Sequence, residues 1–440
     1  MYGWYNGLKP EKGITMINVN DFLRNTDSES FEAALANLGN DRTLVIPPRA
    51  SDIEPERDYW LIDRAILLPE NTTVILQNST IKLSDKCRDN FFRSANCGLG
   101  IDKPEKIRNI HIKGEGTCTL LGADHPRAVG DSSKILANPC PYDLEDLCRP
   151  DMAPWVDEDR KKSGQLRFMR DRHSHSFGTD AGKEGESQYG DWRGIGILFA
   201  NVENFSISNL RIVESHGWGI SLESCTFGRV EKIEFDACMS KVIDGLRQNM
   251  ENQDGVDIRN GCHHIIISDI TGHTGDDLVA LTAIAPDNGL VGGSLCSTHV
   301  MGHDWTRRER GIHDIVIRNV VGYSHLCYNV RLLPANAKIY NVVIDGIVDV
   351  PAEGVEHFGT LLLGASDGNY GKNPPDGMKN ITVSNIISYA KSAISVSGYL
   401  RDSVISNVIN SNPNCEAITV DRENGIVNVK MSNICTVESK

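Results

Sequence analysis

A short pattern of apolar and polar positions recurs along most of this chain. It runs apolar, any, apolar, any, small or polar, apolar, and such alternation with a period of two is typical of β-strands. The copies are Phe205/Ile207/Leu210, Ile265/Ile267/Ile270, Ile315/Ile317/Val320, Val342/Ile344/Ile347, Ile381/Val383/Ile386, Val429/Met431/Ile434 and, with one polar position, Ser403/Ile405/Val408. The pattern predicts a series of short, similar strands.

The next-to-last position of the pattern is occupied by turn-forming residues. They are Asn209, Asp269, Asn319, Gly346, Asn385, Asn407 and Asn433. Asn, Asp and Gly tolerate the left-handed backbone conformation that tight corners require. Their recurrence at one position indicates that the chain makes the same corner repeatedly.

A single copy cannot bury its apolar face alone, so the copies must stack as parallel strands. Parallel crossovers are right-handed in nearly all proteins. We therefore predict an all-β, single-stranded, right-handed parallel β-helix that forms one domain over residues 1–440. An antiparallel sandwich is the alternative, but it does not explain a turn residue that recurs at one position. The variable spacing of the copies argues against a propeller.

The first hundred residues are predicted to hold an N-terminal cap and the first coils, with the main solenoid over 101–440. Residues 26–39 have apolar positions on one helical face, a Thr26/Glu29 capping box and Gly39 placed for the C′ position. A solenoid needs its end covered, so we expect this helix to be the cap. Short strands follow at 43–46, 73–76 and 80–83.

Two segments interrupt the repeat, at about 120–194 and 286–311. The first is polar, charged and rich in proline, and long loops of this kind are often functional. We expect both to be insertions that wall off a pocket. His173 and His175 in the first have no assigned role. Arg307, Arg308 and Arg310 form a basic cluster in the second, which we expect to be a solvated loop, with a substrate clamp as the alternative.

Composition and charge exclude several classes of protein. The net charge of −14 argues against nucleic-acid binding, and no apolar run reaches the roughly 20 residues that span a bilayer. The opening residues lack a signal-like apolar stretch, so we expect a cytoplasmic protein, or a secreted one if a signal has been removed. The 12 cysteines show no metal-binding spacing, so we expect reduced and mostly buried thiols and no metal or other cofactor.

Three carboxylates, Asp254, Asp276 and Asp277, lie within residues 252–282, NQDGVDIRNGCHHIIISDITGHTGDDLVALT. Aligning Val256/Ile258 with Val279/Leu281 places Asp254 level with Asp277, one coil apart and roughly 5 Å away by strand spacing. The same alignment adds Trp218 below and Tyr328 above, which predicts an aromatic, acid, acid, aromatic column. Strict alternation would turn the acids inward together with the apolar residues of the strand. The turn before each strand must therefore shift the alternation by one residue, which Gly255 and Gly275 make possible.

Clustered acids do not all ionise freely, because like charges raise the pKa of at least one. One can then act as general acid and another as base, which is the division that glycoside hydrolysis requires. The alternative is that these acids only terminate turns or bind a structural cation.

The order SHGWGISLESC, NQDGVDI and TGDDLVAL resembles glycoside hydrolase family 28, the polygalacturonase family. The resemblance spans roughly residues 100–435 and implies a right-handed parallel β-helix. It also implies that Asp276 is the general acid, that Asp254 and Asp277 orient and deprotonate the attacking water, and that the reaction inverts the anomeric carbon.

The chain departs from that family in two places. Its Gly-His-Gly motif is missing, with His299, His303 and His325 as candidates, and its Arg-Ile-Lys motif is reduced to Arg331 followed by two leucines. The missing lysine bears on whether polygalacturonate is the substrate. Arg331 alternates with the apolar Val330 and Leu332, so it should face outward, ready to pair with a substrate anion or with the acids.

The candidate substrate-binding residues are His216, Trp218, His325, Tyr328 and Arg331. His216 lies one coil below Asp254, and His325 could hydrogen-bond the acids, although both could also be turn histidines. His263, His264 and His313 begin repeat strands, and we expect them to be structural.

The sequence thus predicts an inverting, exo-acting glycosidase with a carbohydrate substrate, related to pectin or containing uronic acid. A polysaccharide lyase on the same fold, in which the acids hold Ca²⁺, and a non-catalytic carbohydrate-binding solenoid stay open as alternatives.

Overall fold

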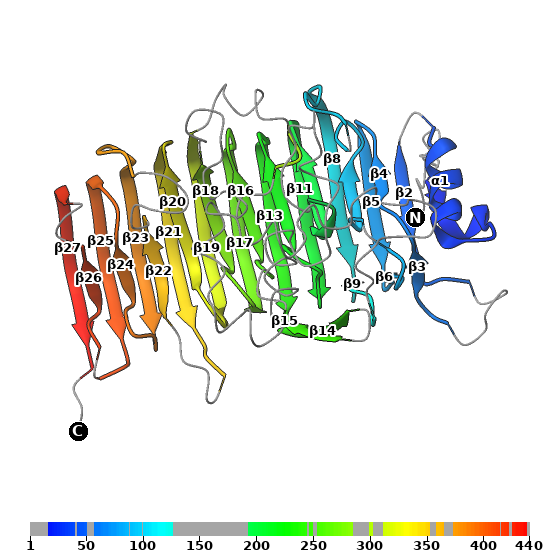
Figure 1. Cartoon of the computed structure of the whole chain (residues 1–440). Helices are drawn as coiled ribbons and strands as arrows, with labels where there is room; N and C mark the ends of the chain where they lie inside the picture. Colours follow the sequence, from blue (N-terminus) through cyan, green and yellow to red (C-terminus); the bar gives the residue numbers. More distant parts are fainter. Residues whose placement is uncertain are drawn as a thin grey trace, which may run out of the picture.

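The computed structural model describes residues 16–39, 42–50, 57–87, 89–98, 100–125, 192–243, 246–249, 253–284, 299–301, 311–352, 358–364, 373–413, 415–421 and 425–437. Most of the two expected insertions therefore lies outside the described residues, and so do His173, His175, His303 and the arginine cluster. The described chain forms the right-handed parallel β-helix that the repeat predicts, with successive coils stacked along one axis (Figure 1).

Two parallel sheets form the walls of the solenoid. The long-strand sheet runs β1 (Ile17–Asn18), β2 (Thr43–Ile46), β5 (Thr72–Gln77), β8 (Ile107–Glu115), β11 (Val202–Val213), β13 (Thr226–Asp236), β17 (His263–Thr274), β19 (Ile312–Ser324), β21 (Ile339–Asp349), β23 (Met378–Ser388), β25 (Leu400–Asn410) and β27 (Ile426–Thr436). Strands β3 (Trp60–Ile62), β6 (Thr80–Leu83) and β9 (Thr119–Leu121) join it from the side.

The short-strand sheet faces it across the core. Its strands are β4 (Ile66–Leu68), β7 (Phe92–Ser94), β10 (Ile197–Ala200), β12 (Ile220–Glu223), β16 (Val256–Arg259), β18 (Val279–Ile284), β20 (Tyr328–Ala335), β22 (Gly359–Leu363), β24 (Ile394–Val396) and β26 (Ile418–Val420). A separate antiparallel hairpin, β14 (Ser240–Ile243) and β15 (Leu246–Asn249), stands beside the solenoid. Two short 3-10 helices cover Val19–Phe22 and Trp192–Gly194.

Equivalent apolar positions of successive coils lie directly above one another. Ile267 pairs with Ile317 on the next strand, and Ile317 pairs with Ile344 on the one after. All three are fully buried and belong to one continuous core that extends through the described coils. The apolar triplets of the sequence therefore identified the inward face of the long-strand sheet correctly.

One coil escaped the sequence pattern. Strand β13 holds Gly228 where other coils hold a large apolar residue, and Gly228 pairs with Phe205 of the coil below. A Cβ at Gly228 would lie 2.0 Å from the Phe205 ring, so the ring fills the space that a side chain would need. The core is complete there, but its apolar residue is supplied by the neighbouring coil.

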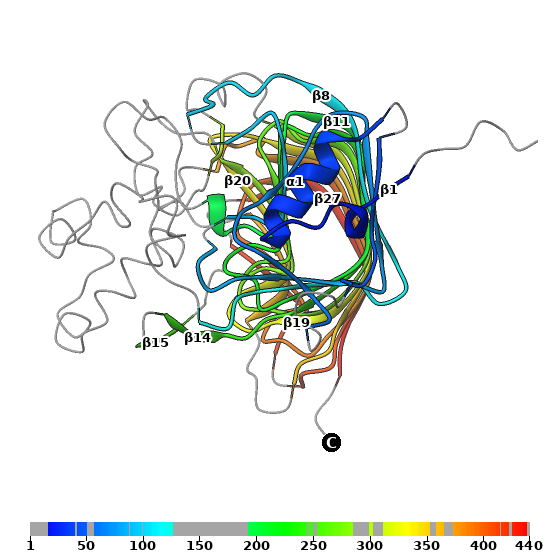
Figure 2. The ribbon, with the colours of Figure 1, turned by 90° about the vertical axis from the view of Figure 1, so that its right-hand side faces the viewer.

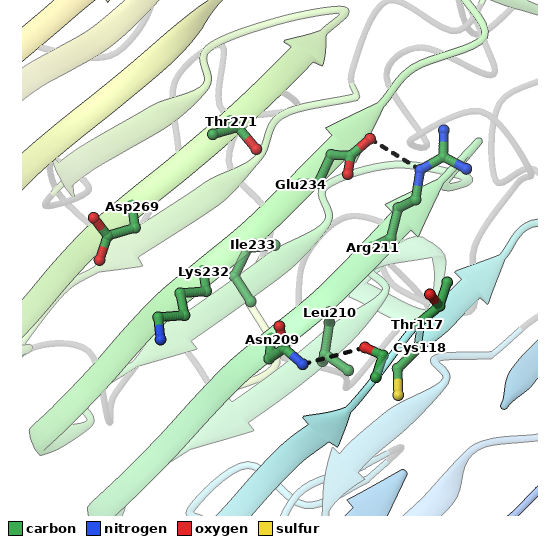
Figure 3. A pocket seen from close by; sticks show the side chains of 11 residues that line it. Thr117, Cys118, Asn209, Leu210, Arg211, Lys232, Ile233, Glu234, Asp269 and Thr271 are labelled. Atoms are coloured by element: carbon green, nitrogen blue, oxygen red, sulfur yellow. Dashed lines mark hydrogen bonds and ion pairs between the residues drawn. The ribbon is translucent and has the colours of Figure 1, made fainter. Parts of the chain in front are cut away.

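The corner position predicted from the recurring asparagines is left-handed. Asp269 has φ 57° and Asn319 has φ 55°, and the Asn319 amide donates to Asp269 Oδ1 at 2.9 Å. In the missed coil Lys232 takes this conformation, with φ 56°, and Figure 3 shows it between Asn209 and Asp269 on successive strands. Asn209, Lys232 and Asp269 line an open hollow of about 410 Å³ on the outer face of the long-strand sheet.

A second left-handed position recurs near the start of the same strands and was not recognised in the sequence. Asn204 donates to Asn109 Oδ1 at 2.7 Å, and Asn341 donates to Asp314 Oδ1 at 2.8 Å. All four residues have φ between 55° and 60°. From β11 to β27 each strand of this sheet therefore bends twice, and side-chain amides link many of the bends between coils.

The predicted cap helix is present as α1 (Asp27–Ala36), and it lies across the end of the coil stack (Figure 2). Thr26 and Glu29 form the expected capping box. The helix ends earlier than predicted, because Asn37 is its C-cap with φ −103°, so Gly39 does not occupy the C′ position. Among the described helices, none is long and apolar enough to cross a bilayer.

The opposite end of the described solenoid is open. In β27 the positions that face the core elsewhere are partly solvent-exposed, with Met431 at 37% and Ile434 at 36%. Equivalent positions one coil earlier, Ile405 and Val408, are fully buried. The last coil thus covers its neighbour without being covered by another described element.

The cysteines that the structure describes are all free thiols, and most of them are buried. Cys225 and Cys262 lie next to each other in adjacent coils, where the Cys225 amide lies 3.3 Å from Cys262 Sγ. Burial raises the pKa of the Cys225 thiol well above its usual value. Such thiols act as small apolar core residues.

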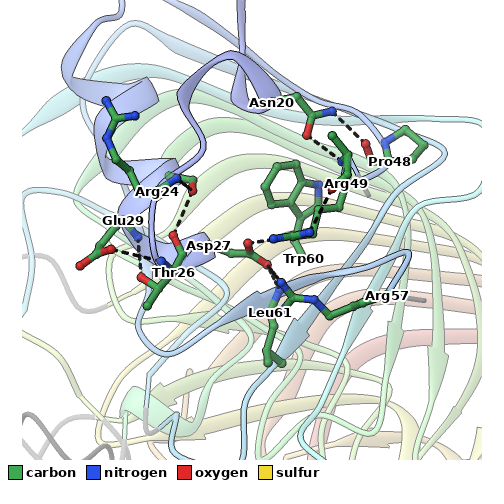
Figure 4. Close-up of polar contacts among 12 residues, drawn as sticks. Asn20, Arg24, Thr26, Asp27, Glu29, Pro48, Arg49, Arg57, Trp60 and Leu61 are labelled. Atoms are coloured by element: carbon green, nitrogen blue, oxygen red, sulfur yellow. Dashed lines mark hydrogen bonds and ion pairs between the residues drawn. The ribbon is translucent and has the colours of Figure 1, made fainter. Parts of the chain in front are cut away.

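One buried carboxylate fixes the cap helix to the first coil (Figure 4). Asp27 Oδ1 accepts from Arg49 Nε at 2.9 Å, while Oδ2 accepts from the Leu61 amide at 2.7 Å and lies 3.2 Å from Arg57 Nη2. The side chain of Asp27 is only 2% exposed. Since a buried arginine left without its partner is strongly unfavourable, this carboxylate should contribute much to the attachment of the cap.

We expect Asp27→Ala to lower the free energy of unfolding by about 3–5 kcal/mol, measured by urea denaturation. The control is Glu32→Ala on the same helix. Glu32 also pairs with an arginine, Arg64, but it is 55% exposed, so its loss should cost less than about 1 kcal/mol. Equal effects of the two substitutions would show that Asp27 does not anchor the cap.

Candidate active site

The register of the short-strand sheet brings the predicted acids together. Val256 pairs with Val279 and Ile258 pairs with Leu281, which is the alignment inferred from the sequence. At the corner before these strands, the Gly255 amide donates to the Asp277 carbonyl at 2.9 Å. Asp254 and Asp277 therefore begin adjacent strands at the same level of the solenoid.

The corner before each strand resets the alternation of inward and outward side chains. Leu278 and Val279 are consecutive, yet both belong to the core, so Asp277 is turned to the outer face. On the adjacent coil a Cβ at Gly255 would lie 2.2 Å from the Leu278 carbonyl oxygen, which only glycine avoids. The close approach of these two corners is what places the acids on the outside of the sheet.

Asp277 lies at the centre of the cluster. Its Oδ2 is 3.2 Å from Arg331 Nη1, and its Oδ1 accepts from the Tyr328 amide at 3.1 Å. Its own amide donates to Asp276 Oδ1 at 3.0 Å. Burial raises the pKa of Asp277 to about 7, against the opposing effect of Arg331 and with a further rise from Asp276.

Asp254 is 7% exposed, and its Oδ1 is buried with no hydrogen-bond partner among the described residues. Burial raises its pKa well above the usual value, and the charges of Asp257, Asp276 and Asp277 raise it further. Asp276 is more exposed than either buried acid. The three acids thus comprise two buried groups that resist ionisation and one group nearer to solvent.

A fourth carboxylate, Asp257, was missed in the sequence. It follows Val256 on β16 and is 1% exposed. Burial raises its pKa well above the usual value, although Arg259 opposes this. The signal was available, because Asp257 lies between the inward-facing Val256 and Ile258 and must therefore point outward on the same face as Arg331.

Gln253 was also overlooked, and it ties the acid-bearing corners together. Its Nε2 donates to the Ser215 carbonyl at 2.7 Å, and its own carbonyl accepts from the Gly275 amide at 2.9 Å. With 1% exposure, it is part of the interior. Gln253 therefore couples the turn before Asp254 to the turn before Asp276.

Arg331 faces outward on β20, as its alternation with Val330 and Leu332 predicts. Of the partners considered for it, the structure shows the acids, since it pairs with Asp277. Tyr328 begins the same strand and has the predicted register with Asp277 through its backbone amide. Tyr328 therefore lies one coil from Asp277, as the alignment predicts.

Trp218, the lower aromatic residue of the predicted column, is covered by other segments and offers no open surface for a sugar ring. The indole of Trp218 is only 7% exposed and packs in an apolar cluster with Trp192 and Met301. The guanidinium of Arg259 lies 4.7 Å from its ring centre. The burial arises because segments distant in sequence, around 192 and 299–301, cover this part of the sheet. The segment 299–301 is itself attached through the Val300 amide, which donates to Glu223 Oε2 at 3.1 Å.

The histidine candidates have protein partners. His216 is 3% exposed, and its Nε2 accepts from the Ala123 amide at 3.0 Å. His325 Nε2 lies 3.3 Å from His273 Nδ1, and the His299 ring lies 3.1 Å from Glu223 Oε1. These contacts support structural roles for His216 and His299, and they orient the His325 ring toward His273.

One group at the site has the spacing of metal ligands: Asp276, Asp277 and Cys327 offer ligand atoms within 4.8 Å of one another. Ca²⁺, the ion expected for a lyase of this fold, takes only oxygen ligands. Burial raises the pKa of the Cys327 thiol well above its usual value, which keeps it protonated and a poor ligand for softer ions. This donor set therefore does not fit the expected ion.

The fold and the site together define a parallel β-helix protein with an acid cluster on the outer face of one sheet. Comparison with known proteins finds a family match for part of the chain. Residues 182–303 match the family model described as glycosyl hydrolases family 28, and these residues include Asp254, Asp276 and Asp277. The resemblance inferred from the sequence is confirmed over this segment, and the match supports a polygalacturonase-like glycosidase. No curated protein matches the chain.

Solved structures share the architecture at low sequence identity. Endo-xylogalacturonan hydrolase from Aspergillus tubingensis has a TM-score of 0.51 at 12% identity, covering 94% of this chain and 90% of its own. A tailspike protein mutant of E. coli bacteriophage HK620, in complex with a pentasaccharide, has 0.53 at 13%, covering 96% and 63%. An exopolygalacturonase from Thermotoga maritima has 0.49 at 16%, covering 97% and 93%. At these identities the first two support the fold alone.

The raised pKa of Asp254 has a consequence for stability. Because the folded state holds this proton more tightly than the unfolded state, its contribution is lost as pH rises from about 4, the unfolded pKa, through the higher folded pKa. Asp254→Asn should therefore unfold at a higher temperature than the wild type at pH 8, with the gain vanishing near pH 4. Thermal unfolding at the two pH values measures this.

The matched control is Asp269→Asn, at the corner ladder on the surface of the long-strand sheet, where most other coils already have asparagine. This substitution should change the unfolding temperature little at either pH. A loss of stability in Asp254→Asn at pH 8 would mean that the Asp254 carboxylate makes favourable contacts that outweigh its burial.

Proposed function

We propose that this protein is an inverting, exo-acting glycosidase that cleaves a bond next to an acidic sugar residue in a pectin-related oligosaccharide. The observation that carries the proposal is the cluster of outward-facing acids with Arg331 on successive coils. The three acids lie inside the segment 182–303 that matches the family model, and Arg331 lies beyond it. A general acid, a base and a cation are the groups that such a reaction requires.

The proposed division of roles among the acids follows the resemblance to glycoside hydrolase family 28. Asp276, the more exposed carboxyl, is proposed to protonate the leaving oxygen, and Asp254 with Asp277 to orient and deprotonate the attacking water. A raised pKa makes a stronger base once it is ionised, and general bases work best with a pKa near the operating pH. The value of about 7 for Asp277 suits this role.

Arg331 is proposed to act twice. It stabilises the ionised form of Asp277, 3.2 Å away, and its guanidinium can also pair with the carboxylate of an acidic sugar. The two leucines that follow Arg331 provide no second cation on this strand. The substrate preference therefore rests on Arg331, which favours one acidic residue next to the cleaved bond over a long polyanionic chain.

Exo action is proposed from the length of the two insertions in the sequence, which interrupt coils close to the acids at about 120–194 and 286–311. Segments of this length beside a site can close one end of a substrate groove. The described part of the second, at 299–301, is anchored on the short-strand sheet through Glu223. An enzyme with a groove closed at one end releases one short product from a chain end.

The proposed roles predict the products and the effect of Asp276→Asn. On a panel of uronic, rhamnose-containing and neutral oligosaccharides, the wild type should release a single saturated product of inverted configuration, observed by NMR and chromatography. Asp276→Asn should lower kcat by about 10²–10⁴, because the leaving oxygen loses its proton donor.

Three other outcomes would contradict the proposal. A product with an unsaturated end, absorbing in the ultraviolet, would indicate a lyase. Random internal cleavage would indicate endo action. Binding without turnover, unchanged by Asp276→Asn, would indicate a carbohydrate-binding solenoid.

The pH profile tests the pairing of Arg331 with Asp277. Since Arg331 lowers the pKa of Asp277, Arg331→Met should raise it, and the acidic limb of kcat/KM should move to higher pH. Arg331→Lys keeps the charge, so it should leave the limb near the wild-type position while KM changes. An unshifted limb in Arg331→Met would remove Asp277 from the base role.

A further inference from the structure

Three histidines gather far from the acids, on the outer face of the long-strand sheet. His263, His264 and His313 offer ligand atoms that all lie within 4.8 Å of one another. They begin strands β17 and β19 and belong to two successive coils, with His263 paired to His313 in the sheet register. Asp276 follows the other end of the 12-residue strand β17, so at roughly 3.3 Å per residue the two clusters are well separated.

The ligand atoms lie close together, and the parallel rings of His263 and His313 stack with their centres 4.8 Å apart. His263 Nδ1 and His264 Nδ1 are 2.8 Å apart. Asp314 adds a carboxylate, with Oδ2 2.7 Å from His313 Nδ1 and 3.7 Å from His264 Nδ1. Tetrahedral bonds of about 2.0–2.1 Å to zinc would place ligand atoms about 3.4 Å apart, within the range of these separations.

The left-handed corner explains how consecutive residues share one site. His264 has φ 57° and Asp314 has φ 55°, at the position that is asparagine in several other coils. This conformation breaks the alternation of the strand, so His263 and His264 contribute to the same cluster. At this corner a side-chain amide hydrogen bond links Asn341 to Asp314. In the preceding coil the corner residue is His264, so an imidazole takes the place of the side-chain amide.

Neighbouring side chains hold the ligands in place. Asn341 Nδ2 donates to Asp314 Oδ1 at 2.8 Å, which leaves Oδ2 directed at the histidines. The ring of Tyr340 stacks on His313 at 4.7 Å, and the ring of Phe227 lies 4.8 Å from His264. Supporting contacts of this kind orient ligands in metal sites.

We propose that His263, His264, His313 and Asp314 form a Zn²⁺-binding site that joins the coils of β17 and β19. Three imidazole nitrogens and one carboxylate oxygen are a donor set that suits zinc and related transition metals and is poorly suited to Ca²⁺ or Mg²⁺. The His264 side chain is 47% exposed, which gives an ion access from solvent. All four ligands come from the protein, so the site is structural and takes no part in sugar cleavage.

The test uses the full chain without a histidine tag, after dialysis against a chelator. Zn²⁺ binding is measured by isothermal titration calorimetry, and Co²⁺ is added separately as a probe, because tetrahedral Co²⁺ absorbs strongly in the visible range. We expect one Zn²⁺ bound per chain, an intense Co²⁺ spectrum and a rise in Tm with added Zn²⁺.

His264→Asn is the decisive variant, because asparagine is the usual residue at this left-handed corner and the backbone should not change. We expect it to weaken Zn²⁺ binding at least about tenfold, to abolish the Co²⁺ spectrum and the Zn²⁺-dependent rise in Tm, and to leave glycosidase activity and the metal-free Tm near wild type. His111→Asn is the control. His111 lies on β8 of the same sheet with Ser206 as its partner, and its loss should not affect binding.

Two results would overturn the site. One is a wild-type chain that binds Zn²⁺ no more tightly than His264→Asn does. The other is a Co²⁺ spectrum of weak, octahedral type that is the same in the wild type and the variant. Since the readouts are metal binding and stability, they are independent of whether the proposed glycosidase activity is found.

Discussion

The close stacking of corners between successive coils is the constraint on which the rest of the structure depends. Parallel strands lie about 4.8 Å apart, so a corner side chain that points at the neighbouring coil collides with it. At the corner before the short-strand sheet this leaves room only for Gly255 against Leu278. On the long-strand sheet it selects residues that tolerate a left-handed backbone and bond to their neighbours, as Asn319 does with Asp269.

The same constraint sets the chemistry of the acids. Asp254 and Asp277 begin strands, so the stack brings them within one coil of each other and buries them whatever their charge. Their burial and mutual repulsion make the ionised state unfavourable, and at Asp277 this is opposed by Arg331 and by the Tyr328 amide. A long solenoid with a continuous apolar core can tolerate such local instability, because each coil is stabilised mainly by its neighbours.

The residues that could be predicted from the sequence are those fixed by the repeat itself. The triplets around Ile267 and Ile317 gave the core, and Val256 aligned with Val279 gave the acid pair. What could not be predicted came from contacts between distant segments: the Phe205 ring that replaces a side chain at Gly228, and the cover over Trp218. The helix end was missed because Asn37 and Gly39 are both acceptable stop signals, and local sequence does not choose between them.

Corners also explain how one scaffold can carry unrelated sites. The backbone of a corner residue is constrained, but its side chain can vary. His264 can therefore replace an asparagine without altering the coil, as Phe227 does at the same corner one coil earlier. Strand residues have no such freedom, because alternate positions are committed to the core. Both clusters of this protein, the acids and the histidines, accordingly begin strands at corners. New chemistry on this fold is therefore expected where a corner and its equivalent in the next coil change together.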